Sequence, residues 1–241
     1  MEKITAIVLS AGKGSRMKSD IPKQYMSLND KPVIYYSLKA FEDSPVSQIV
    51  LVTGKEDVAY CEKEIVQKYR FKKVVAVVAG GAERYDSVYC GLLAAPDTDY
   101  VLIHDGARPM VDQKIINDSI ECVKKAKACV VGMPSKDTIK ISDEQNYAID
   151  TPDRKTLWSI QTPQAFSYEL ICNAYSKLYK DIAQGKDIPT ITDDAMVVEY
   201  ATNQKVKLIE GNYENIKITT PEDILIADIF LKNRKSCVKH F

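Results

Sequence analysis

The sequence has no net charge, few histidines and no long apolar run, and each absence excludes a class of function. Its 33 basic residues equal its 33 acidic ones, so no overall positive field would draw the protein to nucleic acid, and no nucleic-acid partner is expected. Runs such as ITAIVL and ACVVGM are far shorter than the roughly 20 residues of a membrane span, and the first residues lack a signal-peptide pattern. We therefore expect a cytoplasmic protein that has no membrane partner.

Metal cages and disulfide frameworks also lack support in the sequence. The six cysteines are scattered without a C-x-x-C pair, and His104 and His240 are the two histidines that could join them around a metal. Reduced thiols, packed in the core, are expected instead. Because His104 ends an apolar run, we interpret it as a packed structural histidine rather than a proton carrier.

What the sequence does contain is an alternation of short apolar runs with helical patterns. QIVLVT precedes VAYCEKEIVQKY, for example, and YVLIHD precedes IINDSIECVKKA. This order predicts a Rossmann-like three-layer α/β/α fold in which helices cover both faces of a mostly parallel sheet. Residues 1–241 are expected to form a single domain. A last helix is predicted after Thr220, with Pro221 at its first position.

Residues 136–157 depart from the alternating pattern. The segment is polar, alternates in DTIKIS and contains the turn-prone DEQN, which predicts a β-hairpin arm that leaves the sheet. Such an arm is too polar to form its own core, so we expect it to hold a second subunit in a homodimer. A loosely held surface insertion is the alternative interpretation.

A glycine-rich loop, LSAGKGSRM at residues 9–17, follows the first apolar run. Gly12 and Gly14 would allow backbone N–H groups to approach a phosphate. The dinucleotide fingerprint requires a third glycine where Met17 stands, which argues against a dehydrogenase, and the P-loop requires a lysine directly after Gly14. Arg16 and Lys23 add two positive charges, and together these features predict a triphosphate site.

The loop and the following PKQY resemble the signature of sugar nucleotidyltransferases, which join a nucleoside triphosphate to a sugar or polyol phosphate. Later segments resemble, in order, the 2-C-methyl-D-erythritol 4-phosphate cytidylyltransferase family: VVAGGAERYDSVYCGL, VLIHDGARPM, DTPDRKTLWSIQTPQAF, TITDDAMVVE and NIKITTPEDI. The resemblance covers nearly the whole chain. It implies a nucleotidyltransferase fold and transfer of a cytidylyl group from CTP to that polyol phosphate in the non-mevalonate isoprenoid pathway. The products would be 4-diphosphocytidyl-2-C-methyl-D-erythritol and pyrophosphate.

The expected chemistry is a direct in-line attack on CTP, because positioning and charge neutralisation supply most of the acceleration in such transfers. Asp105 ends the run YVLIHD at the rim where open α/β sheets bind ligands, and a carboxylate there suits the cofactor Mg²⁺ or the ribose. Arg16, Lys23 and Asp105 are therefore the catalytic candidates. The resemblance places cytosine recognition at Gly81, Arg84 and Ser87. The expected nucleotide-binding set is Ser10, Ala11, Gly12, Gly14, Arg16, Lys23, Gly81, Arg84, Ser87, Asp105 and Gly106.

A second set of residues is expected to bind the polyol phosphate: Arg108, Thr138, Arg154, Thr162, Thr192 and Lys217. Thr192 also has the character of a helix N-cap. Thr138 and Arg154 lie on the arm, and the resemblance implies that they reach the site of the neighbouring subunit. Two alternatives remain. A related cytidylyltransferase would act on D-ribitol 5-phosphate, although DTIK, PDRKTLW and TDDA favour methylerythritol phosphate, and a nucleotide sensor would bind without turnover.

Overall fold

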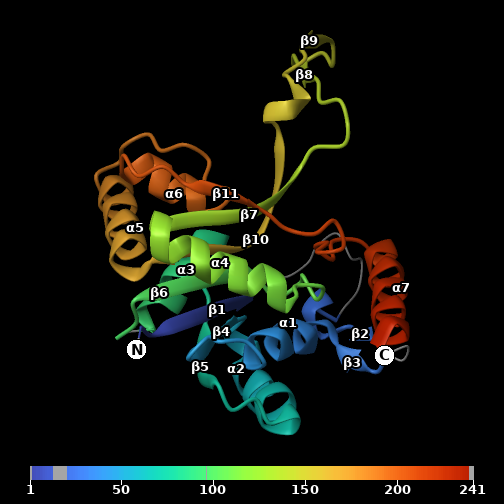
Figure 1. The fold of residues 1–241 in the computed structure, drawn as a ribbon. Helices are drawn as coiled ribbons and strands as arrows, with labels where there is room; N and C mark the ends of the chain where they lie inside the picture. Colours follow the sequence, from blue (N-terminus) through green and yellow to red (C-terminus); the bar gives the residue numbers. More distant parts are fainter. Residues whose placement is uncertain (1, 13–20, 96, 239–241) are drawn as a thin grey trace.

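The computed structural model describes residues 2–12, 21–95 and 97–238, in which seven strands form one central sheet (Figure 1). The order across the sheet is β11-β7-β10-β6-β1-β4-β5, and β10 runs antiparallel to both of its neighbours while the other pairs are parallel. The predicted mostly parallel sheet is thus confirmed. Its strands are β1 (Ile4–Ser10), β4 (Gln48–Thr53), β5 (Val74–Ala79), β6 (Tyr100–Asp105), β7 (Ala128–Pro134), β10 (Trp158–Ser167) and β11 (Lys207–Glu210).

Helices cover both faces of this sheet, as the sequence alternation predicts. One face packs against α1 (Val33–Glu42) and α4 (Gln113–Ala126), and the other packs against α3 (Arg84–Leu93), α5 (Tyr168–Ala183) and α6 (Asp194–Ala201). Strand β1 shows why a central parallel strand is apolar throughout: Ala6 and Val8 belong to the first core, whereas Ile7 belongs to the second. With one core on each face of the sheet, the protein has three layers: helices, sheet and helices.

Shorter elements surround this framework. The 3₁₀ turns η2 (Lys23–Tyr25) and η3 (Lys55–Asp57) follow β1 and β4, and α2 (Val58–Tyr60) continues into the π-helical segment η4 (Cys61–Gln67). The hairpin of β2 (Ser27–Leu28) and β3 (Lys31–Pro32) packs with α7 (Pro221–Val238) around a small third core. As predicted, α7 begins at Pro221, where the Asp223 carboxylate accepts the backbone N–H groups of Thr219 and Thr220 at 2.7 and 2.9 Å.

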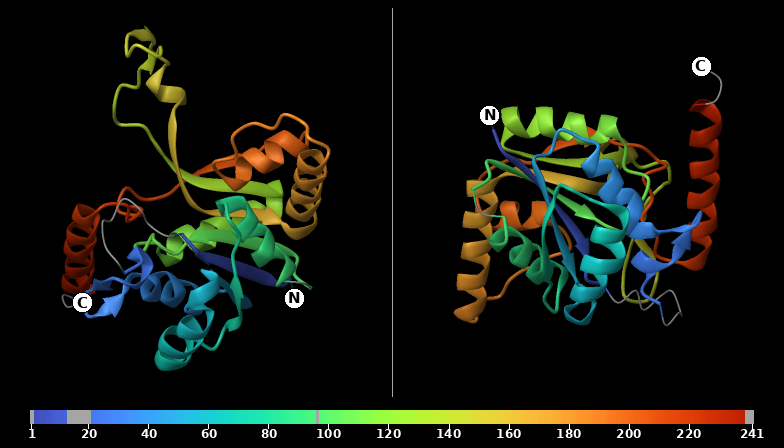
Figure 2. Two further views of the ribbon diagram at one scale, coloured as in Figure 1. Left: turned by 180° about the vertical axis from the view of Figure 1, so that it is seen from behind. Right: turned by 90° about the horizontal axis from the view of Figure 1, so that it is seen from below.

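The arm projects far from the sheet between β7 and β10 (Figures 1 and 2). Its hairpin consists of β8 (Ile141–Ser142) and β9 (Ala148–Asp150), and the 3₁₀ turn η5 (Arg154–Thr156) leads back to β10. At its base the Tyr213 hydroxyl donates to the carbonyl of Pro134 at 2.8 Å, and Lys136 Nζ lies 3.3 Å from the Tyr213 ring centroid. Four large apolar side chains on the arm are solvent-exposed: Ile139, Ile141, Tyr147 and Ile149.

Candidate active site

Two neighbouring cavities open where β1 and β6 end side by side, because parallel strands bring their carboxyl ends to one edge of the sheet. Of the residues expected to bind nucleotide, the first cavity is lined by Ser10, Ala11, Gly12, Lys23, Gly81, Arg84, Ser87 and Asp105. Of those expected to bind the acceptor, the second is lined by Arg108, Thr162, Thr192 and Lys217. Arg84, Asp105 and Lys217 line both cavities and form the wall between them.

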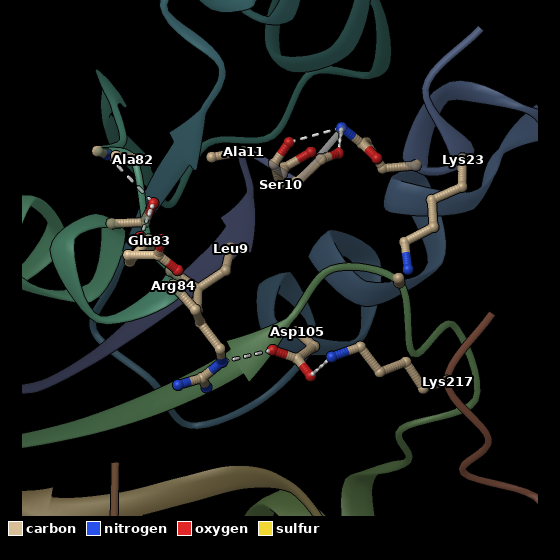
Figure 3. Close-up of a pocket in the computed structure, with 14 residues that line it drawn as sticks. Leu9, Ser10, Ala11, Lys23, Ala82, Glu83, Arg84, Asp105 and Lys217 are labelled. Carbon is tan, nitrogen blue, oxygen red and sulfur yellow. Dashed lines mark hydrogen bonds and ion pairs between the residues drawn. The ribbon is translucent and has the colours of Figure 1, made fainter. Parts of the chain in front are cut away.

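Asp105 is the electrostatic centre of this wall (Figure 3). Its Oδ1 lies 3.3 Å from Arg84 Nε, and its Oδ2 lies 2.8 Å from Lys217 Nζ and 3.9 Å from Arg108 Nε. Burial alone would raise the pKa of this carboxyl, but Arg84, Lys217 and Arg108 outweigh burial and hold the pKa far below its usual range. Asp105 is therefore ionised at any pH at which the protein works.

A chain of hydrogen bonds behind Asp105 fixes its backbone. The Asp105 N–H donates to Thr162 Oγ1 at 3.1 Å, and the fully buried His104 contacts Thr162 Oγ1 through Nδ1 at 3.0 Å and the Arg108 carbonyl through Nε2 at 3.2 Å. Since a carbonyl oxygen only accepts, we assign the ring proton to Nε2, and the Thr162 hydroxyl then donates to Nδ1. Burial lowers the pKa of His104 to about 4. As expected, His104 is a structural histidine and is neutral near pH 7.

Arg84 connects this wall to helix α6 on one face of the sheet. It begins α3, and its Nη2 lies 2.8 Å from Oδ2 of Asp194 in the first turn of α6, while its Nε faces Asp105. Burial alone would lower the pKa of this guanidinium, but the two carboxylates raise it well above its usual value. Arg84 thus directs its charge to the border of the two cavities.

The turn between β5 and α3 forms the end of the first cavity. The Gly81 N–H donates to Ser87 Oγ at 3.2 Å, and that hydroxyl donates to the Glu83 carbonyl at 3.2 Å. A side chain at position 81 would collide with Asp86, so the turn requires glycine there. The residues expected to recognise a base therefore form a compact, internally bonded turn that borders the cavity.

Lys23 lies on η2 and points its amine toward the same cavity (Figure 3). The neighbouring Gln24 is buried, and its amide donates to the carbonyls of Ser10 and Gly12 at 2.7 and 3.2 Å. Gln24 consequently ties the turn that carries Lys23 to the first residues of the glycine-rich loop. Gly14 and Arg16, which are also expected here, lie outside the described residues.

Arg108 dominates the second cavity. Its Nη1 and Nη2 donate to the carbonyls of Asn215 and Ile160 at 2.8 and 3.4 Å, and burial lowers its pKa. These two partners are neutral, and the charged partner of Arg108 is Asp105, whose Oδ2 lies 3.9 Å from Nε, so the guanidinium faces the second cavity as part of the charged wall. Thr192 lines the cavity too, but the expectation that it caps a helix is wrong. Helix α6 begins at Asp194, and Asp193 is the N-cap, accepting the Met196 N–H at 2.9 Å.

Three expected site residues line neither cavity of this chain. Gly106 packs against the body of the protein, since its N–H donates to the Leu9 carbonyl at 2.8 Å and an added Cβ would collide with Ile34 of α1. Thr138 and Arg154 are exposed on the arm, where Arg154 Nη1 donates to the Lys136 carbonyl at 3.0 Å. Within one chain, the arm does not contribute to the site.

The donor set at the wall suits Mg²⁺ in one respect. Mg²⁺ is held in nucleotide sites by one or two carboxylates together with phosphate oxygens, and Asp105 supplies an ionised carboxylate in the lining of the first cavity. Among the residues that the structure describes, no three His, Cys, Asp or Glu side chains gather as a metal cage. A magnesium ion would therefore need ligands from the nucleotide.

Sequence reasoning missed several side chains that build the site, all of them amides or acids that follow a residue already singled out. Gln24 follows Lys23, Asp194 follows Thr192 by two positions, and Gln164 lies two positions after Thr162. Gln164 accepts the N–H groups of Asp194 and Ala195 at 3.0 and 3.1 Å and so holds the start of α6. Each of these three residues lies in the same short motif as a candidate site residue, PKQY, QTPQ or TDDA, and that closeness in sequence could have identified them.

Comparisons with known proteins give a consistent result. The family model described as 2-C-methyl-D-erythritol 4-phosphate cytidylyltransferase matches residues 4–233. The enzyme of that name from Lachnospira eligens is 56% identical over 229 residues, which is 95% of this chain and 99% of the relative. That from Lachnoclostridium phytofermentans is 51% identical, covering 99% of this chain and 100% of the relative.

Solved structures are similar as well. The 4-diphosphocytidyl-2C-methyl-D-erythritol synthase of Anaerococcus prevotii is 34% identical with a TM-score of 0.82 and 96% coverage of each chain. The 2-C-methyl-D-erythritol 4-phosphate cytidylyltransferase of Francisella tularensis is 28% identical with a TM-score of 0.78, covering 95% of this chain and 99% of that one. Both sequence and fold thus point to the same group of proteins.

Proposed function

The chain belongs to the 2-C-methyl-D-erythritol 4-phosphate cytidylyltransferase family, and we propose that its two adjoining cavities bind the two substrates of that reaction. The enzyme transfers a cytidylyl group from CTP to 2-C-methyl-D-erythritol 4-phosphate and forms 4-diphosphocytidyl-2-C-methyl-D-erythritol and pyrophosphate in the non-mevalonate isoprenoid pathway. The names of the relatives favour this acceptor over D-ribitol 5-phosphate.

The wall shared by the two cavities is the observation that supports this assignment most directly. Arg84, Asp105 and Lys217 line both cavities, so a nucleotide in the first and a phosphate in the second would meet across one charged boundary. Two anions repel each other unless cations lie between them. Arg84, Arg108 and Lys217 provide those cations on the acceptor side, and Lys23 provides one on the nucleotide side.

The proposed reaction is a direct in-line displacement. An acceptor phosphate oxygen forms a bond to the α-phosphorus of CTP. The bond from that phosphorus to the oxygen that bridges the α- and β-phosphates breaks at the same time, and pyrophosphate leaves with the electron pair. Lys23 and Arg16 would stabilise the charge on the α-phosphate and on the leaving group. The acceptor phosphate is already ionised, so it requires no general base. The neutral His104, whose ring nitrogens are both engaged, agrees with this.

Magnesium is proposed as the cofactor, held by Asp105 and by oxygens of the triphosphate. When bound, it would neutralise part of the triphosphate charge. Lys217 and Arg84 already pair with Asp105, and their contribution is to keep the carboxylate ionised and fixed in the wall between the cavities.

A homodimer is proposed through the arm. Thr138 and Arg154 are exposed and distant from the cavities of their own chain, and four large apolar side chains are solvent-exposed on the same arm. A second copy would cover these apolar groups and receive Thr138 and Arg154 at its acceptor cavity. Each complete site would then consist of residues from two chains.

No helix among the described residues is both long and apolar enough to cross a membrane. A cytoplasmic location is proposed because five of the cysteines are free thiols: Cys61, Cys90, Cys122, Cys129 and Cys172. Thiols persist in the reducing cytosol, whereas oxidising compartments favour disulfides.

An acceptor panel tests the function. Pyrophosphate release is measured with CTP and Mg²⁺ in the presence of either 2-C-methyl-D-erythritol 4-phosphate or D-ribitol 5-phosphate. We expect turnover with the first and at least about a hundredfold lower kcat/KM with the second, because specificity is a difference in transition-state binding. Faster turnover with ribitol phosphate would overturn the acceptor, and CTP binding without turnover on either compound would indicate a sensor.

A further inference from the structure

The guanidinium of Arg84 is held at both ends by carboxylates from different layers of the fold. Nε contacts Asp105 on β6 at 3.3 Å, and Nη2 contacts Asp194 on α6 at 2.8 Å. The Arg84 side chain is 28% exposed and lines both cavities, whereas Asp194 lines neither. Of the two side chains that contact the Asp194 carboxylate, Arg84 and Tyr175, Arg84 is the one that lines the cavities.

Asp194 is itself fixed from three directions. Its carboxylate is completely buried, the Tyr175 hydroxyl of α5 donates to its Oδ1 at 2.8 Å, and its N–H donates to Gln164 Oε1 of β10 at 3.0 Å. It also lies in the first turn of α6, where the helix dipole favours a negative charge. A buried carboxylate is costly unless it is paired, and among the described residues its ion-pair partner is Arg84.

We propose that Asp194 is a positioning residue that holds Arg84 at the boundary of the two cavities. This inference rests on the proposed function of those cavities. With Asp194 present, the Arg84 guanidinium is attracted by Asp105 at Nε and by Asp194 at Nη2, and it stays between the two carboxylates. Without it, Asp105 would attract the guanidinium alone, and the closer pair would withdraw Asp105 from Lys217 and move the positive charge away from the boundary of the two cavities.

A double-mutant cycle tests whether Asp194 acts through Arg84. Asp194→Asn removes the charge with little change in shape, and we expect kcat/KM to fall about tenfold for CTP and for the acceptor alike, because Arg84 lines both cavities. Arg84→Met removes the group that Asp194 holds. In the Arg84→Met background, Asp194→Asn should change kcat/KM by less than about twofold. An undiminished tenfold loss in that background would overturn the proposal.

Asp181→Asn is the matched control for the loss of a paired carboxylate. Asp181 contacts Lys177 and Lys186 at 3.2 and 2.6 Å and accepts the Tyr200 hydroxyl at 2.9 Å, and it lines neither cavity. This variant should retain the kcat/KM of the unaltered protein. If it loses as much kcat/KM as Asp194→Asn does, general destabilisation explains both variants and the proposal is wrong.

A second variant covers the case in which Asp194→Asn does not fold. Tyr175→Phe leaves the carboxylate in place but removes the donor to Oδ1, so it should lower kcat/KM when Arg84 is present and leave it unchanged in the Arg84→Met background. Equal losses in both backgrounds would overturn the proposal. If the unaltered protein releases no pyrophosphate from CTP and the methylerythritol acceptor, the proposed function itself has failed, which is a separate result.

Discussion

Asp105 at the cavity wall is 8% exposed and contacts three cations, whereas Arg154 on the arm is exposed and donates to a single backbone carbonyl of its own arm. Both residues are expected to serve the same reaction. The wall is built entirely by one chain, with its charges paired and its side chains fixed before any substrate arrives. The arm offers polar and apolar groups that its own chain leaves uncovered. Substitutions in the cavities and on the arm should therefore affect different kinetic constants.

The largest expected effect is at Lys23, which lines the first cavity beside the wall. Lys23→Ala should lower kcat by at least about a hundredfold, because a cation beside the α-phosphate acts mainly on the charge that develops in the transition state. Steady-state kinetics with both substrates saturating would measure it. Lys55→Ala on η3, an exposed lysine that lines neither cavity, is the matched control. A rise confined to KM would contradict the catalytic role of Lys23.

A smaller and more selective effect is expected on the arm. Arg154→Ala should raise KM for the acceptor about tenfold, the cost of one phosphate contact, and leave KM for CTP nearly unchanged. Lys155→Ala, the neighbouring exposed lysine, should change neither constant. Equal increases in KM for both substrates would contradict a role of the arm that is specific to the acceptor. Sedimentation of the same variants would show whether a change in KM accompanies a change in oligomeric state.

The contrast between the regions also explains which features the sequence could predict. Local patterns predict the glycine-rich loop after β1, the position of Asp105 and the hairpin arm. Each pattern is a parallel strand, the end of such a strand or a polar alternation, and each lies within about ten residues of sequence. The role of Asp194 is different: its contact with Arg84 spans 110 residues and forms when α3 and α6 pack on the same face. Gly106 resembled a ligand loop, yet its lack of a side chain serves packing against α1.

The smallest expected effect concerns stability at the wall. His104 has a pKa of about 4 in the folded protein, below the ordinary value of 6.5, so the unfolded chain binds more protons between these two pH values. Stability should consequently fall as the pH drops, by about 2 kcal/mol between pH 7 and pH 5 from this residue alone. Urea unfolding at both pH values, compared between the unaltered protein and His104→Gln, isolates that contribution because His240 is present in each. Asp105 does not contribute within this window, because its loss of stability begins only as the pH falls toward 3.8, the ordinary pKa of an aspartate in the unfolded chain. If both proteins lose the same amount, His104 is protonated as readily in the folded protein as in the unfolded chain, and the region behind the wall is no more closed to solvent than the arm.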